Sequence, residues 1–174
     1  MEAQMLSGKV AIITGATSGM GRSMAELFAE EGAAVVITGR TSKTVDETVA
    51  AIRSKGGKAL GVVADASKKE DTPKVFEAAL AEFGAADTLI NNAGIAALNL
   101  IEETTHAQWD EILAINLSGP MRYIREALKI FLPKNDGVII NISSVNGTRP
   151  VCGASYTASK GALNTLTLNV AMRL

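Results

Sequence analysis

Cysteine and aromatic residues are scarce in this chain of 174 residues. The single cysteine, Cys152, excludes a disulfide within the chain and fits a reducing compartment, so we expect a cytoplasmic protein. Aromatic residues make up only 4% of the sequence. Any hydrophobic core must therefore be built mainly from Ala, Val, Ile, Leu and Met.

The sequence also has no excess of charge and no long apolar run. Lys and Arg total 17 against 18 for Asp and Glu, which gives a formal net charge of −1. This balance offers no electrostatic attraction to nucleic acid or to an anionic membrane. No apolar run approaches the roughly 18 residues that cross a bilayer, and the N-terminal segment lacks the pattern of a signal peptide. We therefore expect neither a nucleic-acid nor a membrane partner.

Apolar residues make up 47% of the chain, which is enough for a core and excludes a disordered protein. Short β-branched runs alternate with segments of helical spacing, and no repeat or linker interrupts them. The expected strands cover residues 10–13, 35–38, 59–64, 88–90 and 138–142, and the expected helices cover 20–31, 43–55, 72–83, 105–132 and 154 onward. This alternation predicts a single α/β domain over residues 1–174, with a doubly wound parallel sheet that binds ligands at the carboxyl ends of its strands.

A glycine-rich segment, TGATSGMG at residues 14–21, follows the first expected strand and begins the first expected helix. Glycine permits a tight turn and a close approach of a pyrophosphate to the backbone, while the helix N-terminus supplies N–H donors. The spacing is G-x-x-x-G-x-G rather than G-x-G-x-x-G. Such a turn can also simply join a strand to a helix, but its place after the first strand favours nucleotide binding.

Four motifs in order resemble those of the short-chain dehydrogenase/reductase family: the glycine loop, NNAG at 91–94, NISS at 141–144 and YTASK at 156–160. The resemblance extends from Gly8 to Leu174. It implies a Rossmann fold, an NADP(H) or NAD(H) cofactor, and hydride transfer to or from a carbonyl or secondary alcohol. Ketoacyl-carrier-protein reductases and sugar or alcohol dehydrogenases are resembled equally, so the substrate stays open.

The resemblance assigns residues of the glycine loop, the second and third strand ends, NNAG and YTASK to cofactor binding. They are Gly15, Thr17, Ser18, Gly19, Met20, Gly21, Arg40, Thr41, Asp65, Ala66, Asn92, Ala93, Gly94, Tyr156 and Lys160. Asn92 and Gly94 are expected to set the loop beside the cofactor. Asp65 resembles the family's acid that contacts the adenine amino group; the alternative is a carboxylate that caps its own loop.

Arg40 favours NADP(H). NAD-selective enzymes place an acid near this strand end, whereas an arginine can pair with a 2′-phosphate. NAD(H) remains the alternative, because Ser18 stands where many NADP enzymes of the family carry a basic residue. An ordinary exposed arginine is the other interpretation.

Tyr156 and Lys160 are four residues apart, so on a helix they share one face. A nearby ammonium stabilises a phenolate, which suits Tyr156 as the proton donor and acceptor. Lys160 is also implied to bond the nicotinamide ribose. The family further implies that Asn116 supports a water and proton relay through its backbone carbonyl; a kink-site asparagine is compatible with this.

The reactive serine is Ser144 by the strand motif, and it would polarise the substrate oxygen. The interval from Ser144 to Tyr156 is one residue shorter than is usual in the family, so Ser143 remains the alternative. Successive strand residues point to opposite faces, so both hydroxyls cannot face the substrate. Cys152 lies in a loop over the expected substrate site and could line it.

Two other residues are expected to be structural. His106 has no Cys or His partner for a metal and lies at a helix start, and Trp109 has the spacing of a packing residue. No metal is expected.

The helical spacing runs to Leu174 without a stop signal. The family normally continues with two further strands and a substrate-covering segment, so we expect these to be missing from the sequence and the fifth strand to form an apolar sheet edge. The alternative function is then a non-catalytic nucleotide-binding fragment. A third reading is a structural partner in an oligomer. The family implies a homo-oligomer, a dimer or a tetramer.

Overall fold

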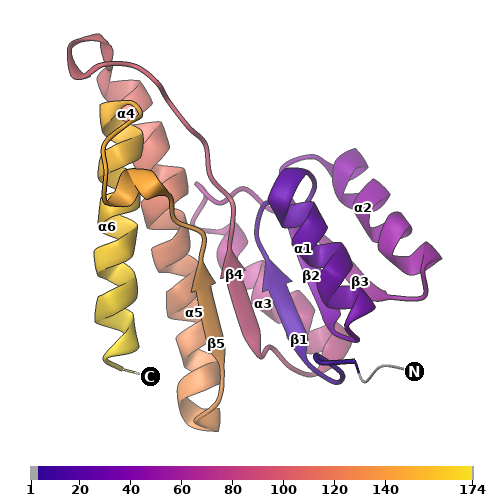
Figure 1. Ribbon diagram of the computed structural model, residues 1–174. Helices are drawn as coiled ribbons and strands as arrows, with labels where there is room; N and C mark the ends of the chain where they lie inside the picture. Colours follow the sequence, from indigo (N-terminus) through magenta and orange to yellow (C-terminus); the bar gives the residue numbers. More distant parts are fainter. Residues whose placement is uncertain (1–3, 174) are drawn as a thin grey trace.

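The computed structural model describes residues 4–173, so Leu174 lies outside the described residues (Figure 1). The five strands are β1 (Val10–Ile13), β2 (Ala34–Gly39), β3 (Lys58–Val63), β4 (Thr88–Asn91) and β5 (Val138–Asn141). The helices are α1 (Gly19–Glu30), α2 (Ser42–Ser54), α3 (Asp71–Phe83), α4 (His106–Leu113), α5 (Gly119–Lys134) and α6 (Ala154–Ala171), and shorter turns are η1 (Ile101–Glu103), η2 (Ala114–Ser118) and η3 (Val145–Gly147). The strands form one parallel sheet in the order β3-β2-β1-β4-β5, which confirms the predicted doubly wound α/β fold.

Helices cover both faces of the sheet, and this explains the apolar runs. Ile12 and Val36 are fully buried on the face covered by α3, α5 and α6, whereas Ile13 and Ile37 are fully buried on the face covered by α1 and α2. The core is aliphatic with few rings, as the composition predicts. None of the helices described in residues 4–173 is long and apolar enough to cross a membrane.

The fifth strand forms the predicted apolar edge of the sheet. In the described chain, β5 pairs only with β4. Ile139 packs with the core on the α5 and α6 side. Val138 and Ile140, which point to the other face, remain 50% and 39% exposed. The strand is thus covered on one face only.

The helical region expected over 105–132 is divided by the π-helical turn η2. The Gly119 N–H bonds to the Ala114 carbonyl, five residues back, instead of continuing the α-helical pattern. Pro120 explains the interruption, because a proline ring inside an α-helix clashes with the carbonyl four residues earlier. That carbonyl belongs to Asn116, which therefore lacks its α-helical donor.

Arg122 fastens η2 to the loop that follows β3. Its Nη2 donates hydrogen bonds to the carbonyls of Ala66 (2.7 Å), Ser67 (3.0 Å) and Ala114 (3.2 Å). Gly119 lies against the same loop, since a Cβ there would approach the Ala66 carbonyl to 2.9 Å. The start of α5 and the end of β3 are therefore held as one unit.

Replacing Arg122 with methionine tests this tie. Arg122→Met keeps much of the side-chain volume but leaves three carbonyls without their donor. We expect the free energy of unfolding to fall by about 1–3 kcal/mol in urea titrations. Arg125→Met is the matched control, because Arg125 is exposed on the same helix; it should change stability by less than about 0.5 kcal/mol. Equal losses of unfolding free energy in the two variants would show that the Arg122 hydrogen bonds do not stabilise this contact.

Candidate functional site

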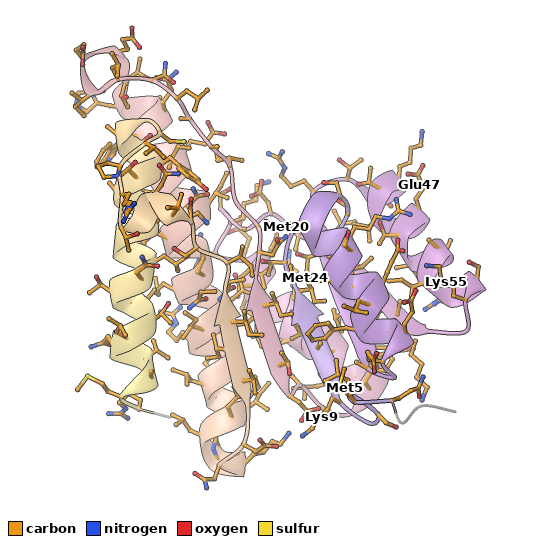
Figure 2. All side chains as sticks on the ribbon, in the orientation of Figure 1. Met5, Lys9, Met20, Met24, Glu47 and Lys55 are labelled. Carbon is orange, nitrogen blue, oxygen red and sulfur yellow. The ribbon has the colours of Figure 1, made fainter. Side chains whose placement is uncertain are left out.

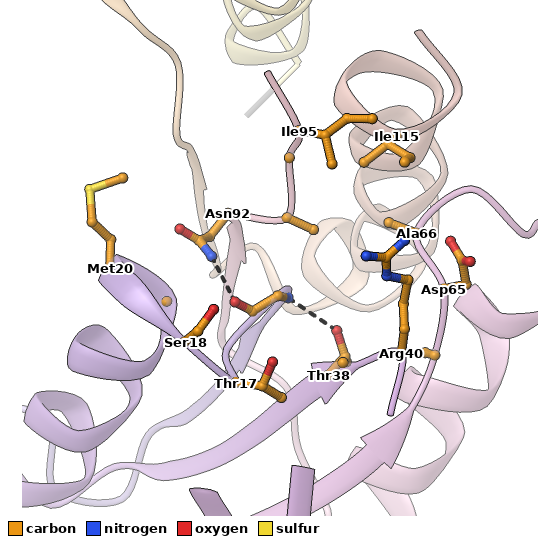
Figure 3. A pocket seen from close by; sticks show the side chains of 16 residues that line it. Thr17, Ser18, Met20, Thr38, Arg40, Asp65, Ala66, Asn92, Ile95 and Ile115 are labelled. Atoms are coloured by element: carbon orange, nitrogen blue, oxygen red, sulfur yellow. Dashed lines mark hydrogen bonds between the residues drawn. The ribbon is translucent and has the colours of Figure 1, made fainter. Parts of the chain in front are cut away.

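A cavity of about 360 Å³ lies at the carboxyl ends of the strands, between the glycine loop and η2 (Figure 3). Its lining residues are Gly15, Thr17, Ser18, Met20, Gly21, Thr38, Gly39, Arg40, Ala64, Asp65, Ala66, Asn92, Ala93, Gly94, Ile95 and Ile115. The structure thus brings most of the residues predicted for the cofactor together at one site. Gly19, Thr41, Tyr156 and Lys160 were also predicted, but they do not line this cavity.

Five lining residues were not predicted: Thr38, Gly39, Ala64, Ile95 and Ile115. Thr38, Gly39 and Ala64 lie at the ends of β2 and β3 beside predicted residues, so the strand ends themselves could have indicated them. Ile95 follows β4 and Ile115 lies in η2. No local sequence pattern indicates that either residue lines the cavity.

The glycine loop is shaped by close backbone contacts. Gly15 has a φ of +63°, and a Cβ there would lie 2.9 Å from the Cα of Ala93. A Cβ on Gly21 would meet the Gly15 carbonyl oxygen. The two glycines therefore keep the loop flat against the start of α1, which leaves the space that a pyrophosphate would need.

The NNAG segment holds this loop from the side of β4. Asn92 Nδ2 donates to the carbonyls of Thr14 (2.9 Å) and Gly15 (3.1 Å), as the dashed line to Gly15 shows in Figure 3. In return, Thr14 Oγ1 accepts the N–H groups of Asn92 and Ala93, both at 3.0 Å. Asn92 therefore holds the glycine loop against the end of β4.

The N-terminus of α1 suits an anionic ligand. Its N-cap residue, Ser18, makes no side-chain capping bond, and no acidic residue lies in the first turn. The first N–H groups of a helix need outside acceptors, and the helix dipole favours negative charge there. With the glycine contacts and the cavity, this donor set fits the pyrophosphate of a dinucleotide.

Arg40 and Asp65 lie at the other end of the cavity. The guanidinium of Arg40 extends toward Asp65 and Ala66 in Figure 3. Asp65 Oδ1 accepts hydrogen bonds from Ser67 N (2.8 Å) and Ser67 Oγ (2.7 Å), so the carboxylate does cap its own loop. Burial alone would raise the pKa of Asp65, but these bonds and the charge of Arg40 hold it below its ordinary value. Thr41 is the N-cap residue of α2 instead.

Asn116 joins three segments near the reaction centre. The residue is fully buried in η2. Its Oδ1 accepts the Ile95 N–H (2.9 Å), and its Nδ2 donates to the Ile95 carbonyl (2.8 Å) and to Ser159 Oγ (3.2 Å). The side chain thus fixes the segment after β4 against α6. The relay expected of its backbone carbonyl stays a prediction.

Lys160 points from α6 toward the end of β5. Its Nζ donates to the Ile142 carbonyl (2.7 Å) and lies 5.7 Å from the centroid of the Tyr156 ring, so the two side chains share a helix face. Burial lowers the pKa of Lys160. A Cβ on Gly94 would come within 3.7 Å of this ammonium, so NNAG and YTASK meet here.

The two candidate serines make different contacts, as the strand geometry predicts. Ser143 Oγ lies 3.5 Å from the Lys160 carbonyl. Ser144 Oγ accepts hydrogen bonds from the backbone N–H and the Nδ2 of Asn146, both at 3.1 Å. Asn146 was not predicted; its position two residues after a serine, where a short turn can form, was the available signal.

The remaining residues singled out in the sequence do not form a second centre. His106 is exposed at the first position of α4, and Trp109 is half-buried on the same helix. Cys152 is half-buried, and its N–H is bonded to Asn146. Within residues 4–173, no three His, Cys, Asp or Glu side chains gather as a metal site would require.

Comparison with known proteins gives a consistent result. The family profile described as short chain dehydrogenase matches residues 9–174. The chain is 39% identical to a 3beta-hydroxysteroid dehydrogenase 1 of Eggerthella lenta, over 96% of this chain and 65% of the relative. It is 41% identical to an NADP-dependent (R)-specific alcohol dehydrogenase of Lentilactobacillus kefiri, over 96% of this chain and 67% of the relative.

Solved structures similar to this chain belong to the same family of proteins as these relatives. A metagenomic short-chain oxidoreductase in complex with NADP has a TM-score of 0.92 at 36% identity, over 97% of this chain and 77% of that one. A short chain dehydrogenase/reductase of Burkholderia phymatum in complex with NAD has a TM-score of 0.93 at 34% identity, over 97% and 61%. This chain therefore spans about two thirds of the length of its relatives. By profile, sequence and structure, it belongs to the short-chain dehydrogenase/reductase family.

Proposed function

We propose that the protein is an NADP(H)-dependent oxidoreductase that interconverts a carbonyl and a secondary alcohol. The observation that carries this proposal is the approach of Gly94, which lines the cavity, to the ammonium of Lys160, which in turn lies 5.7 Å from the centroid of the Tyr156 ring. The relatives support it, since one is named an NADP-dependent alcohol dehydrogenase and one solved structure holds NADP. The substrate beyond a carbonyl or alcohol is open.

The cofactor, when bound, supplies or takes up a hydride. The glycine loop and the first N–H groups of α1 would hold its pyrophosphate. Tyr156 donates a proton to the substrate oxygen during reduction and accepts it during oxidation. Lys160 stabilises the phenolate that results. Ser144 donates a hydrogen bond to the same oxygen.

Arg40 supports the preference for NADP(H). It lines the cavity on an exposed strand end, where a planar guanidinium can make paired hydrogen bonds to a 2′-phosphate. The chain carries no acid at Gly39, Arg40 or Thr41 to accept the hydroxyls of an unphosphorylated ribose. NAD(H) remains the second cofactor to be compared.

A nucleotide-binding role without turnover is the second candidate. The chain spans 65% of the length of the Eggerthella lenta relative, so turnover is tested separately from nucleotide binding. NADPH binding by the unaltered chain without reduction of any ketone would identify this role. We also propose a homo-oligomer, formed through α5 and α6; Leu168 on α6 and Met172, which follows this helix, are 71% and 85% exposed.

Replacing Arg40 tests the cofactor preference. We expect Arg40→Ala to raise the Kd for NADPH about 10- to 100-fold, because a charge-assisted pair of bonds is lost, and to change the Kd for NADH little. Titration of NADPH fluorescence measures both constants. Lys43→Ala is the control, since that side chain is 82% exposed and does not line the cavity. A parallel loss for both cofactors would contradict the assignment.

Replacing Tyr156 tests the chemistry. We expect Tyr156→Phe to bind NADPH normally but to lower kcat by about 10²- to 10⁴-fold, because the proton donor is removed. Tyr123→Phe is the control: burial raises the pKa of Tyr123 to about 12, and its ring packs beside Phe76 in the core. Stopped-flow absorbance at the NADPH band follows turnover. Retained activity in the Tyr156 variant would refute its role.

Light scattering tests the oligomer. We expect a mass of two or four chains, because an exposed apolar helix face is stabilised when a second copy covers it. A monomer at micromolar concentration would contradict this proposal without affecting the catalytic one.

A further inference from the structure

Asn146 contacts both Ser144 and the loop at residues 151–152. The residue lies in η3 and is only 5% exposed. Its Oδ1 accepts the backbone N–H groups of Val151 (3.0 Å) and Cys152 (2.8 Å). Because both partners are obligatory donors, the oxygen of the amide must face them. The amide nitrogen therefore faces Ser144.

Ser144 receives two hydrogen bonds from this one residue. Its Oγ accepts the Asn146 backbone N–H and the Asn146 Nδ2, both at 3.1 Å. A serine hydroxyl has two acceptor lone pairs and one proton to donate. Both lone pairs are thus occupied, and within the described part of the chain the Ser144 hydroxyl donates to no protein acceptor. Its proton is left for a ligand.

Ser143 shows the contrast. Its Oγ is placed to donate to the Lys160 carbonyl, at 3.5 Å, so its proton is directed at the backbone of α6. Of the two hydroxyls, that of Ser144 is therefore the one free to donate to a ligand.

We propose that Asn146 is a positioning residue that makes Ser144 a dedicated hydrogen-bond donor to the substrate oxygen. This inference rests on the proposed function. By filling both lone pairs, Asn146 excludes the rotamer in which Ser144 would accept from the substrate. A hydroxyl that accepts hydrogen bonds is also polarised into a stronger donor. The same amide ties this hydroxyl to the 151–152 loop, so loop and serine keep one relative position.

Asn146→Asp separates these two roles. The carboxylate keeps an acceptor for the Val151 and Cys152 N–H groups, so the loop remains fastened. It replaces the Nδ2 donor with an oxygen that accepts the Ser144 proton, so the serine is turned away from the substrate. We expect kcat for ketone reduction to fall 10- to 100-fold, with the Kd for NADPH unchanged within twofold.

A double-mutant cycle distinguishes positioning from mere structural support. In the Ser144→Ala background, Asn146→Asp should cause no further loss of kcat, because the hydroxyl it acts through is gone. Asn169→Asp, an exposed change on α6, is the control and should leave kcat within twofold. If the Asn146→Asp protein lacks the circular dichroism spectrum of the unaltered protein, Asn146→Ala replaces it in the same cycle.

Each outcome decides the matter. Wild-type kcat in the Asn146 variant, or an equal further loss in the Ser144→Ala background, overturns the inference and leaves the proposed function intact. Absence of turnover by the unaltered protein overturns the proposed function itself, and the inference falls with it. A loss seen only when Ser144 is present supports both.

Discussion

The side-chain amide of Asn116 lies where three segments of the site meet. It bonds both backbone groups of Ile95 and the hydroxyl of Ser159, and it is fully buried. A buried amide left without these partners would cost about 1–3 kcal/mol, so the segment after β4 and the start of α6 have little freedom to separate. The positions of the reacting groups relative to the cavity depend on this contact.

The π-helical turn makes that contact possible. Pro120 prevents a continuous α-helix through Asn116, and Arg122 holds the resulting turn to the loop after β3. The loop after β3 lines the cavity through Asp65 and Ala66, and η2 lines it through Ile115, the neighbour of Asn116. One irregular turn therefore connects the two halves of the site, which agrees with the tendency of such turns to occur at functional positions.

The two halves of the site rely on different chemistry. Around the glycine loop, the glycines leave space for an anion because they carry no side chain, and backbone N–H groups supply the donors. Around α6, side chains carry the reaction: Lys160 is largely buried, and Ser144 is held by Asn146. The first half is set by the local conformation of a strand–turn–helix unit. The second half is set by contacts between segments far apart in the sequence.

This difference explains how much the sequence could predict. The strands were found because helices bury both their faces, as at Ile12 and Ile13, and the glycine loop was found because its pattern is local. The bounds of the elements shifted by no more than two residues, and those of the first strand did not shift. The roles of Arg122 and Asn146 were missed, since Arg122 acts on carbonyls more than fifty residues away and Asn146 acts through hydrogen-bond geometry. The sequence left Ser143 and Ser144 as alternatives, and only the contacts distinguish their hydroxyls.

Transfer of deuterium tests most directly whether a hydride passes from the nicotinamide to the carbonyl carbon of the substrate. The protein would be given NADPH labelled at C4 of the nicotinamide on one face or the other, with acetophenone as the ketone, and the alcohol analysed by mass spectrometry. The proposed hydride transfer predicts one deuterium on the carbinol carbon from one of the two labelled cofactors. Alcohol that carries no label from either cofactor, or no alcohol at all while NADPH binds, would contradict it.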